Sequence, residues 1–312
     1  MTNKGKTKEQ KPRVDWQDRA TDRAIRALIW CALRLPLRVR LGLMGGMMAR
    51  VVAPLAGWQA RAMANLGHIW SDMPEDERRR IARKVADNAG RTMIENYDPQ
   101  GLLARMKDAP ITGPGLPAIE AARAEGRPIL FVTGHYGNFE APRAALVARG
   151  WRIGGLYRPM ANPYFNSHYA ANMHALSDPV FEQGRRGTMG LLKHIKAGGM
   201  GVLLFDVYDS AGLPIDFMGQ PAPTLTSAAE IALRTGALMV PFFGIRRADG
   251  ISFDAIFEEP IPEAPPEDMM RSLTERLEAR IEDDPSQWFW IHRRWKPKRQ
   301  MKRQRKRAAA TM

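Results

Sequence analysis

Residues 129–140 have the sequence ILFVTGHYGNFE, and this stretch indicates the fold class. Its first part, residues 129–133, is an uninterrupted run of apolar and β-branched residues, which is typical of a strand buried on both faces of a parallel sheet. Gly134 then turns the chain, and His135 follows at the turn. Because ligands of open α/β sheets bind beyond the carboxyl ends of the strands, His135 stands where a functional side chain is expected.

A histidine at such a turn can take a proton from a hydroxyl when a carboxylate holds its ring. Glu140 follows His135 by five residues, so the two side chains meet only if His135 lies on the loop before the next helix. Asn138 is placed to cap that helix, whose free backbone amides favour negative charge. A lone histidine is also common as a structural residue, so the spacing alone leaves both interpretations open.

Short apolar runs alternate with helical patterns from residue 116 onward. We predict helices over residues 117–125, 139–149, 189–197, 227–235 and 267–282. We predict strands over residues 128–133, 152–157, 201–205 and 238–244, with residues 251–257 as an antiparallel strand at an edge. This alternation predicts an α/β fold with a largely parallel sheet flanked by helices, occupying residues 116–296.

The N-terminal part of the chain differs in composition. Residues 1–21 are polar and predicted to be a disordered arm, and residues 22–115 are predicted to be a helical, membrane-associated region followed by a connector. Arginines interleaved with apolar residues suit an interfacial helix on an anionic bilayer, although the same pattern fits an amphipathic helix packed on the domain. Residues 41–60 are long enough to span a membrane, but Arg50 near the middle makes spanning costly.

The charge of the chain points to an anionic partner. The net charge is +14, and residues 297–312 form a basic tail. Cys31 is the one cysteine, which excludes an internal disulfide and a cysteine-based zinc site, and the histidines show no metal-ligand spacing. The polar N-terminus does not resemble a signal peptide, so secretion is not expected.

Several motifs together carry a resemblance to a known family. The loop 134–140 resembles the glycerolipid acyltransferase motif of His, four residues, and Asp or Glu. Further pieces are similar to the lauroyl/myristoyl-type lipid A biosynthesis acyltransferases of Gram-negative bacteria. These pieces are Tyr157-Arg158-Pro159 with Asn162-Pro163, then Phe205-Asp206 followed by PIDFMG at residues 214–219, and SQWFWIHRRWK at residues 286–296. They occur in the family order over about residues 25–296.

The resemblance implies transfer of a fatty acyl chain from acyl carrier protein to a hydroxyl of an anionic, glucosamine-based lipid A precursor, a secondary acylation in lipopolysaccharide biosynthesis. His135 would deprotonate the acceptor and Glu140 would orient the ring, with no cofactor and no metal. Such enzymes work at the cytoplasmic face of the bacterial inner membrane and bind no nucleic acid. The candidates for substrate binding are Asn138, Arg158, Asp206, Arg293 and Arg294.

The chain departs from the family pattern in two places. Asp206-Val207-Tyr208-Asp209 stands where the family often has Asp-Gln-Asp, and no arginine occurs between Asn166 and Phe181. Each candidate also has a structural interpretation: Arg158 can anchor a loop, Asp206 can hold Arg158 or a loop, and Arg293 with Arg294 can seal the C-terminal segment. Trp288, Trp290 and Trp295 fit either a core or an interfacial aromatic belt, and His292 is expected to be structural.

Two other functions remain open from the sequence. One is an acyltransferase for another membrane lipid, such as a glycerolipid or an aminolipid. The other is a non-catalytic basic protein that binds membranes or nucleic acid. The sequence does not fix the acyl-chain length, the hydroxyl that is acylated, or whether the donor is acyl carrier protein or coenzyme A.

Overall fold

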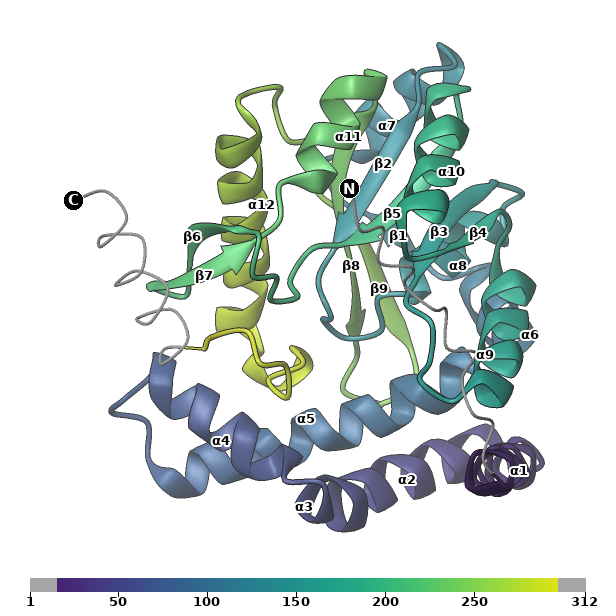
Figure 1. Ribbon diagram of the computed structural model, residues 1–312, viewed down its shortest axis with the longest axis vertical. Coiled ribbons are helices and arrows are strands. Elements are labelled where there is room, and N and C mark those ends of the chain that lie inside the picture. The colour runs from purple at the N-terminus through teal and green to yellow at the C-terminus, as the bar shows by residue number, and fades with distance from the viewer. Residues whose placement is uncertain (1–15, 297–312) are drawn as a thin grey trace, which may run out of the picture.

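The computed structural model describes residues 16–296, which form a seven-stranded sheet flanked by helices (Figure 1). The strand order is β1-β9-β8-β2-β5-β3-β4. The strands of this sheet are β1 (Ile111–Thr112), β2 (Ile129–Thr133), β3 (Ile153–Tyr157), β4 (Val180–Glu182), β5 (Met200–Leu204), β8 (Leu238–Arg246) and β9 (Phe253–Phe257). A separate antiparallel hairpin joins β6 (Leu213–Phe217) and β7 (Gln220–Thr224).

The helices fall into an N-terminal group and a group that covers the sheet. The first group contains α1 (Trp16–Leu33), α2 (Leu37–Met47), a π-helical turn (Met48–Val52), α3 (Ala53–Leu55), α4 (Trp58–Ile69) and α5 (Glu75–Asn96). The second contains α6 (Pro99–Met106), α7 (Leu116–Ala124), α8 (Ala141–Val147), α9 (Pro163–Leu176), α10 (Arg185–Lys196), α11 (Ser227–Thr235) and α12 (Pro266–Asp283). A short 3₁₀ turn (Pro285–Gln287) precedes the final segment.

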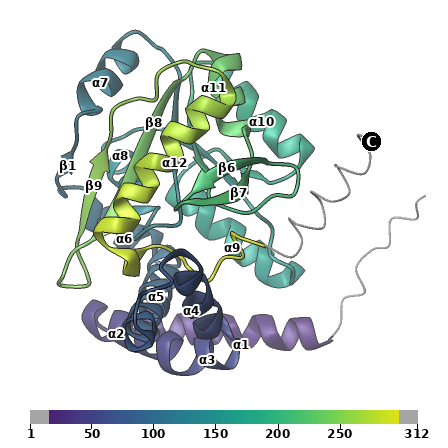
Figure 2. The same ribbon diagram turned by 90° about the vertical axis from the view of Figure 1, so that its left-hand side faces the viewer.

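Strand β2 is buried on both faces, as its sequence predicts. Successive side chains of a strand point to opposite faces. Leu130 and Val132 therefore join one core with residues of α10, α11 and α12, whereas Ile129 and Phe131 join a second core with residues of α6, α7 and α8. The result is three layers, with the sheet between two layers of helices (Figure 2).

The strand order determines which loops meet at the carboxyl edge of the sheet. Strand β2 pairs in parallel with β8 on one side and β5 on the other, and β5 separates β2 from β3. The residues that follow β2 and β5 are therefore neighbours. Strand β9 runs antiparallel to β8, as predicted, but it is not an edge strand because β1 pairs with it on its far side.

The N-terminal helices lie together at the carboxyl end of the strands, and both views show them there (Figures 1 and 2). They are not a separate unit, because Leu66 of α4 and Ile81 and Val85 of α5 belong to the core that contains Leu130. Helix α5 begins with three acidic residues, Glu75, Asp76 and Glu77, which suit the N-terminus of a helix.

Three boundaries differ from the sequence prediction or fall outside the described residues. Helix α1 begins at Trp16, so the predicted disordered arm is wrong for residues 16–21. Residues 1–15 of that arm and the basic tail 297–312 lie outside the described residues. The predicted connector contains α6, whose first turn is capped by Asp98 through a hydrogen bond from the Gly101 amide.

Within residues 16–296, no single helix is long and apolar enough to cross a membrane. The segments Leu37–Leu55 and Trp58–Ile69 satisfy the length and composition test only as a pair, and they are bent by 84° at the break between them.

Candidate active site

His135 and Asp206 form the centre of the candidate site. His135 follows β2 and Asp206 follows β5, so the pairing of these two parallel strands brings both residues to the same edge of the sheet. The Nδ1 atom of His135 lies 2.7 Å from Oδ1 of Asp206. The backbone amide of His135 donates to Oδ2 of the same carboxylate over 2.8 Å. Asp206 thus holds both the ring and the main chain of His135.

Asp206 is buried and accepts three hydrogen bonds. The indole Nε1 of Trp288 donates to Oδ2 over 2.9 Å, which adds a third hydrogen bond to the two from His135. Burial by itself raises the pKa of Asp206, but the charge and hydrogen bonds of His135 outweigh it and hold the pKa well below the usual range. The carboxyl group is therefore ionised at neutral pH.

An ionised Asp206 fixes the tautomer of His135. A carboxylate only accepts hydrogen bonds, so the Nδ1 atom of neutral His135 must carry its proton toward Asp206. The other ring nitrogen, Nε2, is then left with a free lone pair. The side chain of His135 is 24% exposed, so a substrate hydroxyl can reach it. This is the arrangement of a general base.

The loop that carries His135 is tied to the C-terminal segment and to β8. The amide of Gly137 donates to the Gln287 carbonyl over 2.9 Å, and the amide of Phe289 donates to the His135 carbonyl over 3.0 Å. Gly137 has φ = 55°, and a Cβ atom there would collide with the Gly244 carbonyl oxygen. Only glycine meets both conditions, which explains its place in the motif.

Three aromatic rings surround the imidazole of His135. Phe139 lies 5.2 Å away between ring centroids, Phe289 lies 6.3 Å away, and His292 lies 4.4 Å away with the two imidazoles nearly perpendicular. His292 is therefore part of the site, although the sequence indicated only a structural role for it. The signal that could have located it is its position in the SQWFWIHRRWK segment.

His292 is held in its neutral form. Burial is the main cause, and the neighbouring His135 and Arg294 add to it, so that the pKa of His292 falls to about 3 despite the opposing effect of Asp206. Its Nε2 atom is buried and has no hydrogen-bond partner among the described residues. Neutral His292 therefore adds no positive charge beside His135 at neutral pH.

Among the described residues, the side chains that could together hold a metal ion are His135, Asp206 and His292. One ligand atom from each lies within 4.8 Å of the others. Two of the three, His135 and Asp206, are hydrogen-bonded to each other. The expectation that the chemistry needs no metal stays a prediction.

Glu140 does not hold the ring of His135, which corrects the role that the sequence suggested. Its carboxylate accepts a hydrogen bond from Arg143 over 3.2 Å, and both side chains are buried. Glu140 stands at the start of α8, where its amide donates to the side chain of Asn138. The carboxylate that orients His135 instead comes from Asp206, which is 71 residues away in the sequence.

Asn138 is buried, and both the nitrogen and the oxygen of its side chain are hydrogen-bonded inside the protein. Its amide group donates to Glu95 over 3.0 Å, and its carbonyl oxygen accepts from the Glu140 amide over 3.0 Å. Glu95 is also buried and accepts hydrogen bonds from Arg246 and Arg105. Asn138 thus links the loop that carries His135 to an internal ion network.

The arginine candidates have different surroundings. Arg158 follows β3 and is exposed, and Arg293 is exposed as well. Arg294 is buried, donates to the Pro223 carbonyl over 2.8 Å, and also donates to the Thr224 hydroxyl. Burial lowers the pKa of Arg294 to about 10. Arg294 therefore fastens the β6–β7 hairpin, which is the sealing role, whereas Arg158 and Arg293 remain accessible.

The C-terminal tryptophans form a core. Trp288, Trp290 and Trp295 are buried, and Trp288 lies 4.8 Å from Trp290 and 5.8 Å from Trp295 between ring centroids. Phe217 of the hairpin packs on Trp288 at 5.2 Å. This cluster supports the indole that contacts Asp206, so it belongs to the scaffold of the site and not to an aromatic belt.

The chain is similar to known proteins over most of its length. A model of the family described as bacterial lipid A biosynthesis acyltransferase matches residues 7–297. A lipid A biosynthesis acyltransferase of Haemophilus influenzae is 24% identical over 272 residues, which cover 82% of this chain and 81% of that protein. A lipid A biosynthesis lauroyltransferase of Escherichia coli is 27% identical over 284 residues, which cover 86% of this chain and 89% of that protein.

The family match extends over nearly the whole chain and includes the His135 loop, Asp206 and the C-terminal segment. The chain belongs to the bacterial lipid A biosynthesis acyltransferase family.

Proposed function

We propose that this acyltransferase of lipid A biosynthesis carries out a secondary acylation, in which a fatty acyl chain passes from acyl carrier protein to a hydroxyl of a lipid A precursor. The observation that carries the proposal is the His135–Asp206 pair, because it supplies an oriented general base at an accessible edge of the sheet. A hydroxyl acceptor needs such a base, whereas a protein that only binds lipid does not.

The reaction proceeds in two steps at this pair. Nε2 of His135 accepts the proton of the acceptor hydroxyl while the hydroxyl oxygen attacks the carbonyl carbon of the thioester. The C–S bond then breaks, and the departing thiolate takes the proton from the imidazolium, which leaves an ester and a free thiol. Asp206 stabilises the imidazolium through the 2.7 Å contact. The acceptor is itself the nucleophile, so no acyl-enzyme forms.

The other candidate residues serve the site in three ways. Glu140 and Asn138 are buried and bonded within the protein, so we assign them to holding the loop and not to contacting substrate. Arg158 and Arg293 are exposed cations, and we assign them to the anionic groups of the lipid acceptor. Arg294 acts indirectly, because it anchors the hairpin against the C-terminal segment.

The enzyme would act at the cytoplasmic face of the bacterial inner membrane. Support comes from the exposed large apolar side chains, because seven of thirteen among the described residues fall within residues 16–55. Such side chains, next to many arginines, favour the surface of an anionic bilayer. The net charge of +14 also favours an acidic carrier protein as donor.

Replacing His135 by Ala tests the chemistry. General-base catalysis contributes about 10²- to 10⁴-fold, so we expect a loss of that size in acyl transfer with unchanged folding. Undiminished turnover in this variant would overturn the mechanism.

Mass spectrometry of lipid A from cells that lack the gene tests the acceptor, because loss of one secondary acyl chain is expected. Unaltered lipid A would favour a glycerolipid or aminolipid acceptor instead.

A further inference from the structure

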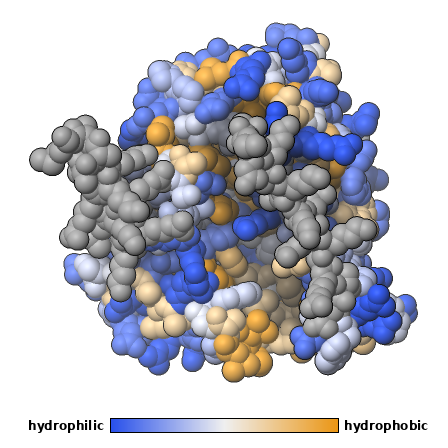
Figure 3. Space-filling view, viewed as in Figure 1, coloured by the Kyte–Doolittle hydropathy of each residue, from blue (hydrophilic) through white to orange (hydrophobic). Residues whose placement is uncertain are grey.

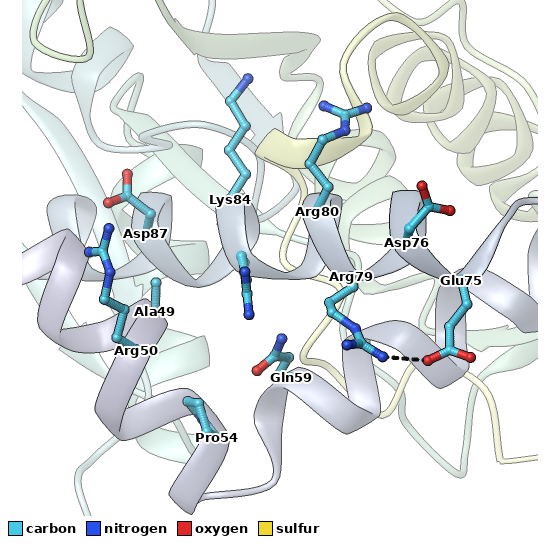
Figure 4. A pocket seen from close by; sticks show the side chains of 11 residues that line it. Ala49, Arg50, Pro54, Gln59, Glu75, Asp76, Arg79, Arg80, Lys84 and Asp87 are labelled. Atoms are coloured by element: carbon cyan, nitrogen blue, oxygen red, sulfur yellow. Dashed lines mark hydrogen bonds and ion pairs between the residues drawn. The ribbon is translucent and has the colours of Figure 1, made fainter.

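A basic cavity lies outside the site described above, between α5 and the segment that leads from the π-helical turn through α3 to α4. Its volume is about 980 Å³ (Figure 4). Its charged lining consists of five basic side chains, Arg50, Arg79, Arg80, Arg83 and Lys84, and three acidic ones, Glu75, Asp76 and Asp87. Ala49, Pro54 and Gln59 complete the lining. A cavity with this charge balance favours an anion.

Two of the three carboxylates are already neutralised. Glu75 accepts from Arg79 over 2.6 Å, as Figure 4 marks, and Asp87 accepts from Arg91 over 2.5 Å. Arg50 and Arg83 form no ion pair with any described residue, and both are exposed. Two guanidinium groups on opposite walls of the cavity therefore have donors left for a bound anion, and a guanidinium fork matches phosphate geometry.

An apolar tip adjoins the cavity. Leu55 is 85% exposed and directly follows the cavity residue Pro54, and Val51 is half exposed beside Arg50. Val39 and Leu43 on α2 are also exposed. The chain bends by 84° after Leu55, so this tip projects at a corner of the molecule. In Figure 3 an apolar patch stands at the lower edge, where Figure 1 places α3.

The cavity and the candidate active site both lie at the carboxyl edge of the sheet. Asn65 of α4 donates to the carbonyls of Trp290 and His292 over 2.8 and 2.9 Å. Asn88 of α5 donates to the Ser286 carbonyl over 3.1 Å. The helices that wall the cavity thus hold the segment that packs on His135. A membrane surface that binds the apolar tip would therefore lie at the same edge of the sheet as His135.

We propose that the cavity between α3 and α5 binds the anionic headgroup of a bilayer lipid while Leu55 and Val51 enter the acyl-chain boundary. A bilayer is favoured over an acidic carrier protein because exposed apolar and cationic side chains stand side by side, which is the composition of an interfacial site. The inference rests on the membrane location in the proposed function and is independent of the acyl-transfer chemistry.

Binding of the full-length protein to vesicles tests this site. One set of vesicles contains only phosphatidylcholine and the other adds phosphatidylglycerol. Replacing both Arg50 and Arg83 by Ala should weaken partition onto the anionic vesicles roughly 30-fold, because each cation contributes about 1 kcal/mol near the headgroups. Partition onto the neutral vesicles should stay unchanged. Leu55→Ala should weaken partition onto both kinds at least about tenfold.

The matched control removes two other exposed arginines, Arg152 and Arg234, which precede β3 and β8 at the opposite edge of the sheet. This double Ala variant has the same net charge as the cavity variant and should bind like the unaltered protein. Equal losses in the two variants would show a diffuse charge effect and overturn the site. Binding to neither vesicle would overturn the membrane location as well. Lost binding to acidic carrier protein with intact vesicle binding would assign the cavity to that protein instead.

Discussion

Two carboxylates compete for the role of partner to His135, and their surroundings separate them. Asp206 touches the ring and the backbone of His135, whereas Glu140 is paired with Arg143. Only Asp206 can set the tautomer that frees Nε2. Glu140 acts on the loop through α8, so it is a positioning residue in this arrangement.

The Asp206→Asn variant should lose about 10²- to 10⁴-fold in kcat, because the neutral amide no longer fixes the Nδ1–H tautomer or stabilises the imidazolium. The measurement is thiol release from the acyl donor at saturating acceptor.

Glu140→Gln is the comparison, since it also replaces a buried carboxylate by an amide of the same size. We expect this variant to lose stability because buried Arg143 loses its counter-charge, and to lose less kcat than Asp206→Asn. A larger loss in Glu140→Gln than in Asp206→Asn would return the catalytic role to the motif glutamate.

His292 gives the folded protein a defined sensitivity to acid. The pKa of an unfolded histidine is near 6.5, whereas that of folded His292 is about 3, so unfolding takes up a proton between these values. Stability from this residue is complete above pH 6.5 and declines as the pH falls through the window. The slope is at most about 1.4 kcal/mol per pH unit. Urea unfolding at a series of pH values measures it.

The His292→Gln variant should flatten that acid limb, because the group that titrates is gone. His174→Gln is the control, since His174 is exposed and pairs with Asp178 on the surface. If both variants keep the slope of the unaltered protein, His292 is not the titrating group.

At the scale of elements, the loop that carries His135 is held by a buried ion network between α5 and β8. Glu95 is fully buried and accepts from Arg246 at 2.7 and 3.0 Å, from Arg105 at 3.2 Å and from Asn138 at 3.0 Å. One carboxylate therefore pairs with two arginines and also holds the loop that carries His135.

The Glu95→Ala variant should lose about 3–5 kcal/mol of unfolding free energy, because Arg246 would be left buried and uncompensated. Chemical denaturation followed by tryptophan fluorescence measures the loss. Glu267→Ala breaks the exposed pair with Arg271 and should cost no more than about 1 kcal/mol. Equal costs in the two variants would show that the network does not stabilise the fold.

The elements of the α/β region could largely be predicted from sequence. The apolar run of β2 and the helical pattern of α11 fall within one residue of their predicted bounds, since burial on both faces and amphipathic spacing are local signals. The β6–β7 hairpin and α9 were not predicted. The hairpin contains Pro214, Pro221 and Pro223, which weaken a strand signal, and it is held by Arg294 from far along the chain.

The contrast between local signals and contacts from distant segments also explains which parts of the candidate site could be predicted. His135 could be located because strand, glycine and histidine are consecutive in the sequence. Its pairing with Asp206 could not be derived, because it depends on β5 lying next to β2 although β3 and β4 come between them in the chain. Glu95, likewise, lies in a helix whose sequence shows only an amphipathic pattern, and its partners come from three other segments.

At the scale of the whole molecule, charge is distributed unevenly. Residues 297–312 contain seven of the lysines and arginines and no acidic residue, so a chain that ends at residue 296 has a net charge of +7 in place of +14. The His135–Asp206 pair and its supporting contacts all lie before residue 297. The tail can thus be removed without removing any group of the proposed chemistry.

Removing residues 297–312 should therefore reduce the rate of encounter with an acidic carrier protein and leave the chemical step unchanged. Electrostatic steering raises association rates by about 10- to 10³-fold. It weakens as ionic strength rises, because the screening length of the solution is only about 10 Å at 0.1 M salt. In the full chain, kcat/KM for acyl carrier protein should fall as salt rises, and in the shortened chain it should start lower and fall less. The acceptor is presented in neutral detergent micelles, so that membrane binding does not contribute. A shortened chain with the same salt dependence as the full chain would show that the tail does not steer the donor, and a lower kcat would place the tail in the reaction itself.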